Sequence, residues 1–453
     1  MNAPDQRRIA RQLLDLSLPI IGLNVLNVIA LAVDTAMCGR LQDSERVLTA
    51  LGFSTQVVFL LMVLMIGLTV GSVAFVARAH GAGHDERVNH VLHQSTQLTL
   101  LLGMFIAIAG NLLAPWILAG LGADPDVNQT AQLYLRPLLA GTPFYYVSLL
   151  YAAVLRGVGN TRLAFVVALA SNGLNVVLNY GLILGNWGLP ALGIQGAAIG
   201  TVCAHAFGSV LLFVLLRRGA VGSVRPTLRP KRFDRPLVGD LVRIGWPAAA
   251  DMVVLNAAFL SIIGMLGHVE QVAVAAHGIG LRIQALAFVP GMSISQATGA
   301  MIGQALGARD LERAKAVLWS SAVLCTAVMT TLGLGLIALA APIVRIFDVD
   351  PASRLGELSI VWMECLGYGL PIVGFYIAFV GLLQGSGATK TSLRINLLTT
   401  LVFQIPASYV LGFTLGLGPF GIWVAFPLGF VLKAGLGLRE YRRGEWAKLG
   451  ARA

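Results

Sequence analysis

The chain has 453 residues, of which 57% are hydrophobic and 12% charged, and its mean hydropathy is +0.79. Soluble domains carry about 25% charged residues, so this composition excludes an ordinary soluble domain and places the chain in a bilayer. The net charge of +11 does not indicate nucleic-acid binding, because the basic residues lie in short loops between apolar segments. The four cysteines (Cys38, Cys203, Cys325 and Cys365) are scattered without CxxC spacing, which disfavours a disulfide framework or a metal site.

Apolar segments long enough to cross a bilayer, which takes about 20 residues each, follow one another along the whole chain. The first follows Arg7, Arg8 and Arg11 and is too long for the apolar core of a signal peptide, so we expect it to be retained. The sequence therefore predicts an all-α membrane protein of twelve helices, at residues 14–39, 50–77, 92–115, 132–155, 161–184, 191–216, 242–266, 274–302, 317–341, 359–383, 393–413 and 419–437.

The distribution of Lys and Arg predicts the orientation. Most of the 32 basic residues lie before the first helix, in loops after even-numbered helices, or after the last helix. Because cytoplasmic loops are enriched in Lys and Arg, we expect both termini in the cytoplasm. The six exceptions are Arg40, Arg46, Arg136, Arg282, Arg345 and Arg354.

The two halves of the chain are similar at a fixed spacing of 228 residues. The segment LRGVGNTR at 155–162 recurs as LQGSGATK at 383–390. The recurring single residues are Pro19 and Pro247, Gln56 and Gln284, and Pro143 and Pro371. Because six helices separate the repeats, both halves enter the membrane from the same side, and we expect two pseudo-symmetric lobes that enclose a cavity and alternate its access.

We expect three regions from this repeat. Residues 1–216 form the first lobe, 217–241 a basic cytoplasmic linker, and 242–453 the second lobe with a basic tail. Pro19 and Pro247 are expected to kink the first helix of each lobe, because proline removes a backbone hydrogen bond.

Asp34 is the most informative polar residue, because an Asp at mid-bilayer costs roughly 2.5–3.5 kcal/mol. In the fifth predicted helix Asn172, Asn175 and Asn179 share one face, and Thr201 lies one turn after Ala197 in the sixth. Asp34, Asn175, Asn179, Thr201 and the Ala197 carbonyl would make an all-oxygen site for a proton or a sodium ion. The alternatives are a structural Asp34 and amides that only hold helices together.

Other polar and aromatic residues are candidates for the substrate cavity. Asp251 either faces a cytoplasmic vestibule or is a half-buried surface acid, and His277 is either packed in a core or functional. The full set of cavity candidates is Gln56, Gln284, Tyr145, Tyr151, Asp251, Asn256 and His277.

The chain resembles the MATE family, the multidrug and toxic compound extrusion transporters. The matching motifs are Pro19 with Asp34-Thr35 and Gly39, LRGxGxT at 155–161, Asn175-x-x-x-Asn179-Tyr180, Gly193/Gly196, and AAHGIG around His277. The resemblance implies two six-helix lobes in a V that rock between inward-open and outward-open states, and a cation site at Asp34, Asn175, Asn179, Thr201 and the Ala197 carbonyl.

The chain departs from two family patterns. Some members carry a second acid where this chain has Asn179, and another branch uses acids that fall here at Leu255 and Val373. The chain is therefore most similar to the DinF-like branch, which relies on the N-lobe Asp. We expect proton coupling, with sodium left open; Asp34, Asn175 and Asn179 are metal ligands only in the sodium case.

The resemblance implies a secondary antiporter of the bacterial inner membrane that exports small organic, often cationic, compounds in exchange for H⁺ or Na⁺. We expect a monomer with no cofactor and no nucleic-acid partner. A flippase for lipid-linked oligosaccharides or other amphiphiles of the same superfamily is the alternative. An enzyme is disfavoured, because the sequence has no HExxH or GxSxG motif.

Overall fold

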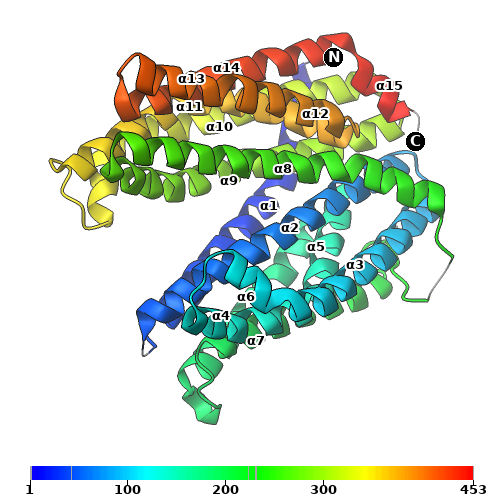
Figure 1. Ribbon diagram of the computed structural model, residues 1–453. Coiled ribbons are helices and arrows are strands. Elements are labelled where there is room, and N and C mark those ends of the chain that lie inside the picture. Colours follow the sequence, from blue (N-terminus) through cyan, green and yellow to red (C-terminus); the bar gives the residue numbers. More distant parts are fainter. Residues whose placement is uncertain (1–2, 42, 223, 230–231, 452–453) are drawn as a thin grey trace. The chain divides into compact units, whose positions relative to one another are not determined.

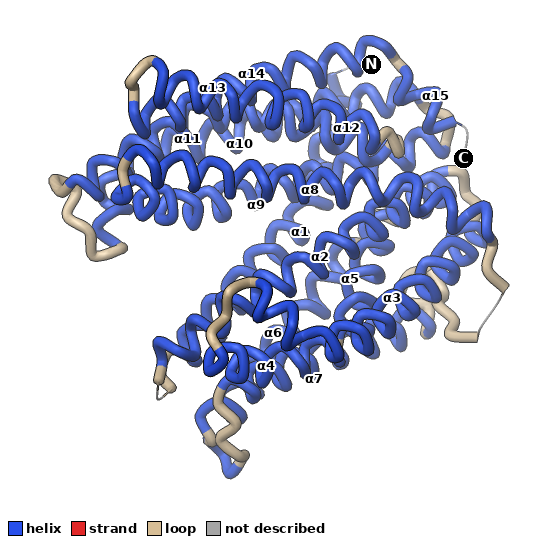
Figure 2. The backbone as a smooth tube through the Cα atoms, viewed as in Figure 1, coloured by secondary structure: helices blue, strands red, loops and turns tan. Residues whose placement is uncertain are grey.

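The computed structural model describes residues 3–41, 43–222, 224–229 and 232–451, and this part of the chain contains helices and loops but no strand (Figure 2). Eleven of its helices are long and apolar enough to cross a membrane, and a bent pair counted as one span makes twelve. The predicted all-α membrane fold of twelve crossings is therefore confirmed, and no predicted segment extends more than three residues beyond its span.

The helices of the first half follow the chain in order (Figure 1). They are α1 (Ala3–Cys38), α2 (Ser44–Gly81), α3 (Asp85–Gly120), α4 (Pro125–Ala140), α5 (Thr142–Gly157), α6 (Thr161–Leu184), a 3₁₀ turn at Asn186–Gly188, and α7 (Ile194–Arg217).

The second half repeats this order. Its helices are α8 (Arg235–Val269), α9 (Gln271–Gly307), α10 (Leu311–Ile346), α11 (Arg354–Gly385), α12 (Thr389–Asn396), the π-helical η2 (Leu397–Gln404), α13 (Ile405–Tyr409), the π-helical η3 (Val410–Thr414), α14 (Gly418–Arg443) and α15 (Glu445–Ala451).

The fourth predicted helix, 132–155, differs from the structure, where it is broken into α4 and α5 with a bend of 54° at Gly141. Pro143 in the first turn of α5 lacks the N–H that would continue the helix. Gly141 faces Val202 of α7, and a Cβ at Gly141 would lie 2.5 Å from the Val202 side chain. The break therefore combines a missing donor with close packing of α7, two features that apolar length does not reveal.

Two compact units divide the chain inside helices rather than between them. Unit 1 comprises Met1–Ile21 and Trp246–Ala453, and unit 2 comprises Gly22–Gly245. Ile9, Leu13 and Ile20 of α1 belong to the hydrophobic core of the second half, and the start of α8 packs in the core of the first half. These boundaries differ from the sequence-based division at 216/217 and 241/242, because packing does not follow the order of the chain.

The surface of α3 shows why the chain needs a bilayer. Leu101, Phe105, Ile108, Leu112 and Trp116 recur every three or four residues and are each at least half exposed. Residues at this spacing share one helix face, and exposed apolar stripes of this length are rare on soluble monomers. The stripe therefore fits contact with lipid tails.

The segment between α7 and α8 is docked on α3. Gln94 Nε2 donates to the Arg232 carbonyl at 3.1 Å, and Gln94 Oε1 accepts from the Asp234 N–H at 3.2 Å. His90 Nε2 hydrogen-bonds to Asp234 Oδ2 at 2.9 Å, and this bond holds the pKa of Asp234 below its usual range. Asn89 and His93 also hydrogen-bond to this segment. The described part of the linker is therefore held against α3.

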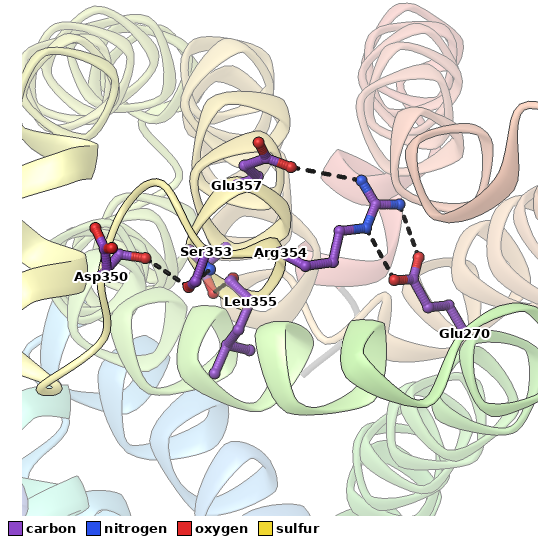
Figure 3. Close-up of polar contacts among 8 residues, drawn as sticks. Glu270, Asp350, Ser353, Arg354, Leu355 and Glu357 are labelled. Carbon is purple, nitrogen blue, oxygen red and sulfur yellow. Dashed lines mark hydrogen bonds and ion pairs between the residues drawn. The ribbon is translucent and has the colours of Figure 1, made fainter.

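An ion-pair cluster fixes the α8–α9 turn of unit 1 to the start of α11 (Figure 3). The Arg354 guanidinium binds Glu270 through two hydrogen bonds of 2.9 and 2.8 Å, and it lies 3.7 Å from Glu357. Ser353, which caps α11 by accepting from the Gly356 N–H, itself donates to the Asp350 carbonyl. The hydrogen bonds from Arg354 hold the pKa of the Glu270 carboxyl below its usual range.

We predict that Glu270→Gln lowers the free energy of unfolding by about 0.2–1 kcal/mol at pH 7, as expected for a partly exposed ion pair. Because the folded-state pKa of Glu270 is depressed, this contribution is present above the unfolded-state value of about 4.3 and is lost as pH falls through the folded-state pKa. Unfolding of the detergent-solubilised protein at pH 7 and pH 3 measures the difference, with Glu357→Gln as the control of smaller effect. Equal losses at both pH values would contradict the ion pair.

Candidate functional site

A hydrogen bond between α1 and α6 forms the centre of the candidate site. Asn179 Nδ2 donates to Asp34 Oδ1 at 2.6 Å, and both side chains are buried. Asp34 lies on the last turns of α1, a helix of which only 11% of the most apolar stretch is buried. The bond therefore connects α1, a helix with little buried surface, to α6.

Two further predicted residues join this pair. Asn175 Nδ2 donates to Thr201 Oγ1 at 3.2 Å, and Asn179 Nδ2 also lies 3.4 Å from Asn175 Oδ1. The Thr201 hydroxyl also hydrogen-bonds to the Asp34 carboxylate. Ala197 is fully buried on α7, one turn before Thr201. The structure thus brings together side chains from α1, α6 and α7, as helical spacing predicted.

The amide oxygen of Asn179 is fully buried and accepts no hydrogen bond from the described residues. Buried polar atoms are normally satisfied, so an oxygen acceptor beside a carboxylate suits a proton or a hard cation. Gly200 of α7 packs against this same oxygen, and a Cβ at position 200 would collide with Asn179 Oδ1. Gly200 therefore allows the amide to lie where it does.

The Asp34 carboxylate opens on a cavity of about 350 Å³ inside unit 2. Most of its lining is apolar, from Leu23 and Ala30 of α1 to Val202 and Leu212 of α7. The described lining contains one acid, Asp34, and no Lys or Arg. Its size is at the lower end for small-molecule sites, and its charge favours a cation over an anion.

The other candidates of the first half differ in whether they line the cavity. Tyr145 lines the cavity, and its ring packs on that of His205 with centroids 4.6 Å apart. Tyr151 is buried in the core outside the lining, and Gln56 is exposed on α2. The roles of Tyr151 and Gln56 in a substrate path remain predictions.

Sequence reasoning missed Asn27 and Tyr134, which also line the cavity. Asn27 precedes Asp34 by seven residues and so shares its helix face, a signal that was available in the sequence. His205, which the sequence left open between a packed core histidine and a functional one, lines the cavity one turn after Thr201. Tyr134 comes from α4, whose position depends on the break at Gly141.

The candidates of the second half lie in unit 1 and line no part of this cavity. His277 is enclosed by Trp362, Trp423 and Phe426, with the Trp362 ring centroid 4.9 Å away. Gln284 is buried, and Asn256 is half-buried on α8. Asp251 is buried and accepts a hydrogen bond from Asn396 at 2.7 Å, so it is not a half-buried surface acid.

Pro19 and Pro247 lie inside α1 and α8, close to the points where the packing units divide, after Ile21 and after Gly245. Their role as kinks remains a prediction. Among the described residues no three His, Cys, Asp or Glu side chains come together as a metal site. A bound cation would therefore depend on one carboxylate and neutral oxygens.

Comparison with known proteins gives the family. The MatE family model matches residues 19–181 and again 247–410, so it covers both halves at the 228-residue spacing of the repeat. The chain belongs to the MatE family. It is therefore a membrane transporter for small molecules rather than an enzyme, and a multi-pass protein of the bacterial inner membrane type.

Relatives and solved structures cover nearly the whole MatE chain. It is 26% identical to the probable multidrug resistance protein NorM of Thermotoga maritima over 97% of this chain and 94% of that protein. It is 28% identical to the multidrug resistance protein MdtK of Cronobacter sakazakii over 94% and 93%. The crystal structure of MATE in the bent conformation matches with a TM-score of 0.89 at 23% identity, over 98% and 99%, which confirms the fold.

We predict that Gly200→Ala lowers the free energy of unfolding of this MatE protein by about 1–3 kcal/mol, because the added methyl overpacks against Asn179. Gly173→Ala on α6, where a Cβ meets nothing within 4 Å, is the matched control and should be neutral or stabilising. Thermal unfolding in detergent measures both. Since the clash needs the amide, Gly200→Ala should cost less in an Asn179→Ala background; equal costs in both backgrounds would show that Asn179 is not the neighbour that matters.

Proposed function

We propose that this MatE protein is a secondary antiporter that exports small organic, often cationic, compounds in exchange for H⁺, with Asp34 as the group that couples the two. The observation that carries the proposal is a single buried carboxylate, bonded to Asn179, in the lining of an apolar cavity. The names of the relatives, multidrug resistance proteins over nearly the full length, support export of diverse compounds.

Protonation of Asp34 changes its hydrogen bonds. The ionised carboxylate accepts from Asn179 and Thr201, and charge-assisted bonds of this kind are stronger than neutral ones. A proton on Asp34 weakens them and removes the charge that favours a cationic substrate in the cavity. Proton entry from outside therefore loosens α1 and releases the substrate, and proton loss to the cytoplasm restores the site.

The energy for export comes from the proton gradient. One charge that crosses the membrane contributes about 2.3 kcal/mol per 100 mV. For an uncharged substrate this suffices for roughly a 50-fold concentration at that potential, since 1.4 kcal/mol is a factor of ten. A monovalent cation exchanged for one proton moves no net charge, so the pH difference drives its export. An oxygen set of Asp34, Asn175, Asn179 and Thr201 also suits Na⁺, which is the alternative coupling ion.

The remaining parts of the proposal follow the same reasoning. The excess of Lys and Arg places both termini and the central linker in the cytoplasm. The transporter acts as a monomer with no cofactor beyond the coupling ion. Reliance on Asp34, with Leu255 and Val373 where another branch has acids, fits the DinF-like branch.

We predict that Asp34→Asn abolishes gradient-driven efflux of a cationic dye from proteoliposomes, so that the measured rate falls at least tenfold. The amide keeps the size of the side chain but cannot exchange a proton. Asp15→Asn is the matched control, because Asp15 lies on the same helix and is exposed. Normal efflux by Asp34→Asn would rule out this mechanism.

We predict that the wild-type protein moves the dye under an imposed pH gradient and not under an imposed Na⁺ gradient. The reason is that one carboxylate with amide and hydroxyl neighbours is sufficient for proton exchange. Efflux under the Na⁺ gradient alone would mean that the same site couples export to Na⁺ instead of H⁺. No movement under either gradient would favour the lipid-linked oligosaccharide flippase.

A further inference from the structure

Unit 1 contains a buried carboxylate–asparagine pair of its own. Asn396 Nδ2 of α12 donates to Asp251 Oδ1 of α8 at 2.7 Å, and Ser392 Oγ donates to Asp251 Oδ2 at 3.3 Å. All three side chains are more than nine-tenths buried. As with α1, little of α8 is buried, 17% of its most apolar stretch against 72% in α11.

This pair resembles the Asp34–Asn179 pair but lies at a different position along the repeat. The two partners are 145 residues apart in both cases. By the 228-residue repeat, Asp251 corresponds to Leu23 and Asn396 to Ala168, each eleven residues before Asp34 and Asn179. Eleven residues are about three helical turns and roughly 16 Å. The pair therefore lies on the same helix faces as its counterpart, three turns nearer the helix starts.

A buried lysine accompanies Asp251 but has no counterpart beside Asp34. Lys433 of α14 is 5% exposed, and its Nζ lies 6.0 Å from the centre of the Tyr376 ring. The Tyr376 hydroxyl donates to Asn396 Oδ1 at 3.4 Å, and Asn396 bonds Asp251. Tyr376 and Asn396 therefore link Lys433 to Asp251 without a direct ion pair between the two charged groups. Lys433 lies inside the predicted helix 419–437, but the sequence did not indicate that its ammonium is buried.

In the 228-residue repeat, the positions of this cluster correspond to positions that line the cavity of unit 2. The counterparts of Tyr376, Ser392 and Lys433 are Ser148, Ala164 and His205, and all three line the cavity, as do Leu23 and Ala168. In unit 1 these positions are filled by an acid, a base and hydrogen-bonding side chains. The two units thus use equivalent positions in opposite ways, one as a cavity and one as a polar cluster.

We propose that Asp251 and Asn396 form the second ion-pairing centre of the transporter, in which the tethered ammonium of Lys433 takes the place of the dissolved cation that Asp34 binds. A buried carboxylate is stabilised by a positive partner or by protonation, and electrostatic interactions act over several ångströms in a low dielectric. The other Lys and Arg side chains of α12 and α14 are exposed; they are Lys390, Arg394, Arg439, Arg442 and Arg443. The comparison with Asp34 rests on the proposed function; the pairing of Asp251 with Lys433 does not.

If Asp251 and Lys433 pair, removing one of the two charges should destabilise the protein more than removing both. We expect Lys433→Met and Asp251→Asn each to lower the Tm of the full chain in detergent by about 5 °C or more, because each leaves one buried charge uncompensated. The double variant should return to within about 2 °C of the wild type. Lys390→Met, an exposed lysine on α12, is the matched control and should leave Tm unchanged.

A cation from solution should replace the missing ammonium. In Lys433→Met the Tm should rise when the pH is lowered from 8 to 5, or when NaCl replaces choline chloride, and this rise should vanish in the double variant. All variants are measured in an Asp34→Asn background as well, which removes the unit 2 site from the readout. The result is therefore independent of whether Asp34 couples transport.

Two results would overturn the pairing. The first is additivity, in which the double variant loses the sum of the two single losses. The second is a Lys433→Met protein whose Tm responds to pH and Na⁺ no more than that of the double variant. If Lys433→Met does not fold, the yield of folded protein in membranes becomes the readout: recovery on adding Asp251→Asn supports the pairing, and no recovery overturns it.

Discussion

The structure depends on the cost of placing a carboxylate in a medium that cannot solvate it. A bilayer-spanning chain avoids such groups unless each is compensated, and here both buried pairs use an asparagine amide to bond the acid. Asp34 with Asn179 attaches α1, and Asp251 with Asn396 attaches α8. These are the first helices of the two repeats and are among the least buried. In both pairs, therefore, a titratable side chain bonds a lightly packed helix to its neighbour.

The duplicated chain has kept its scaffold and changed its chemistry. Glycines and prolines recur at 228 residues, because turns and close helix approaches are needed in both halves. The buried acids do not recur in register: the position of Asp34 is Ile262 in the second half, and that of Asp251 is Leu23 in the first. One half keeps an open cavity with a single acid, and the other fills the equivalent positions with Tyr376, Ser392 and Lys433. Two copies of one fold can thus divide the work of binding and of charge balance.

Much of this was predictable from the sequence, and the exceptions have physical causes. The helices follow from apolar segments of bilayer length. Helical periodicity grouped Asn175 with Asn179 on one helix and Ala197 with Thr201 on the next. The break at Gly141 depends on contact with Val202, which no local pattern encodes. Lys433 resembles a tail lysine, because its burial depends on α8, α11 and α12 packing around it. Asn27 was missed although it precedes Asp34 by seven residues, a spacing that places both on one helix face.

The exchange of helix ends between the two units has a consequence for biosynthesis. Ile9 and Leu13 are made first, yet their core partners, such as Ile294 and Met301, lie nearly 300 residues further on. The core of unit 2 in turn includes Leu237 and Leu241, which follow the linker. A nascent chain that stops after α7 therefore cannot complete its own core. Each core therefore contains residues from both halves of the chain, and neither core is complete until the second half has begun to be made.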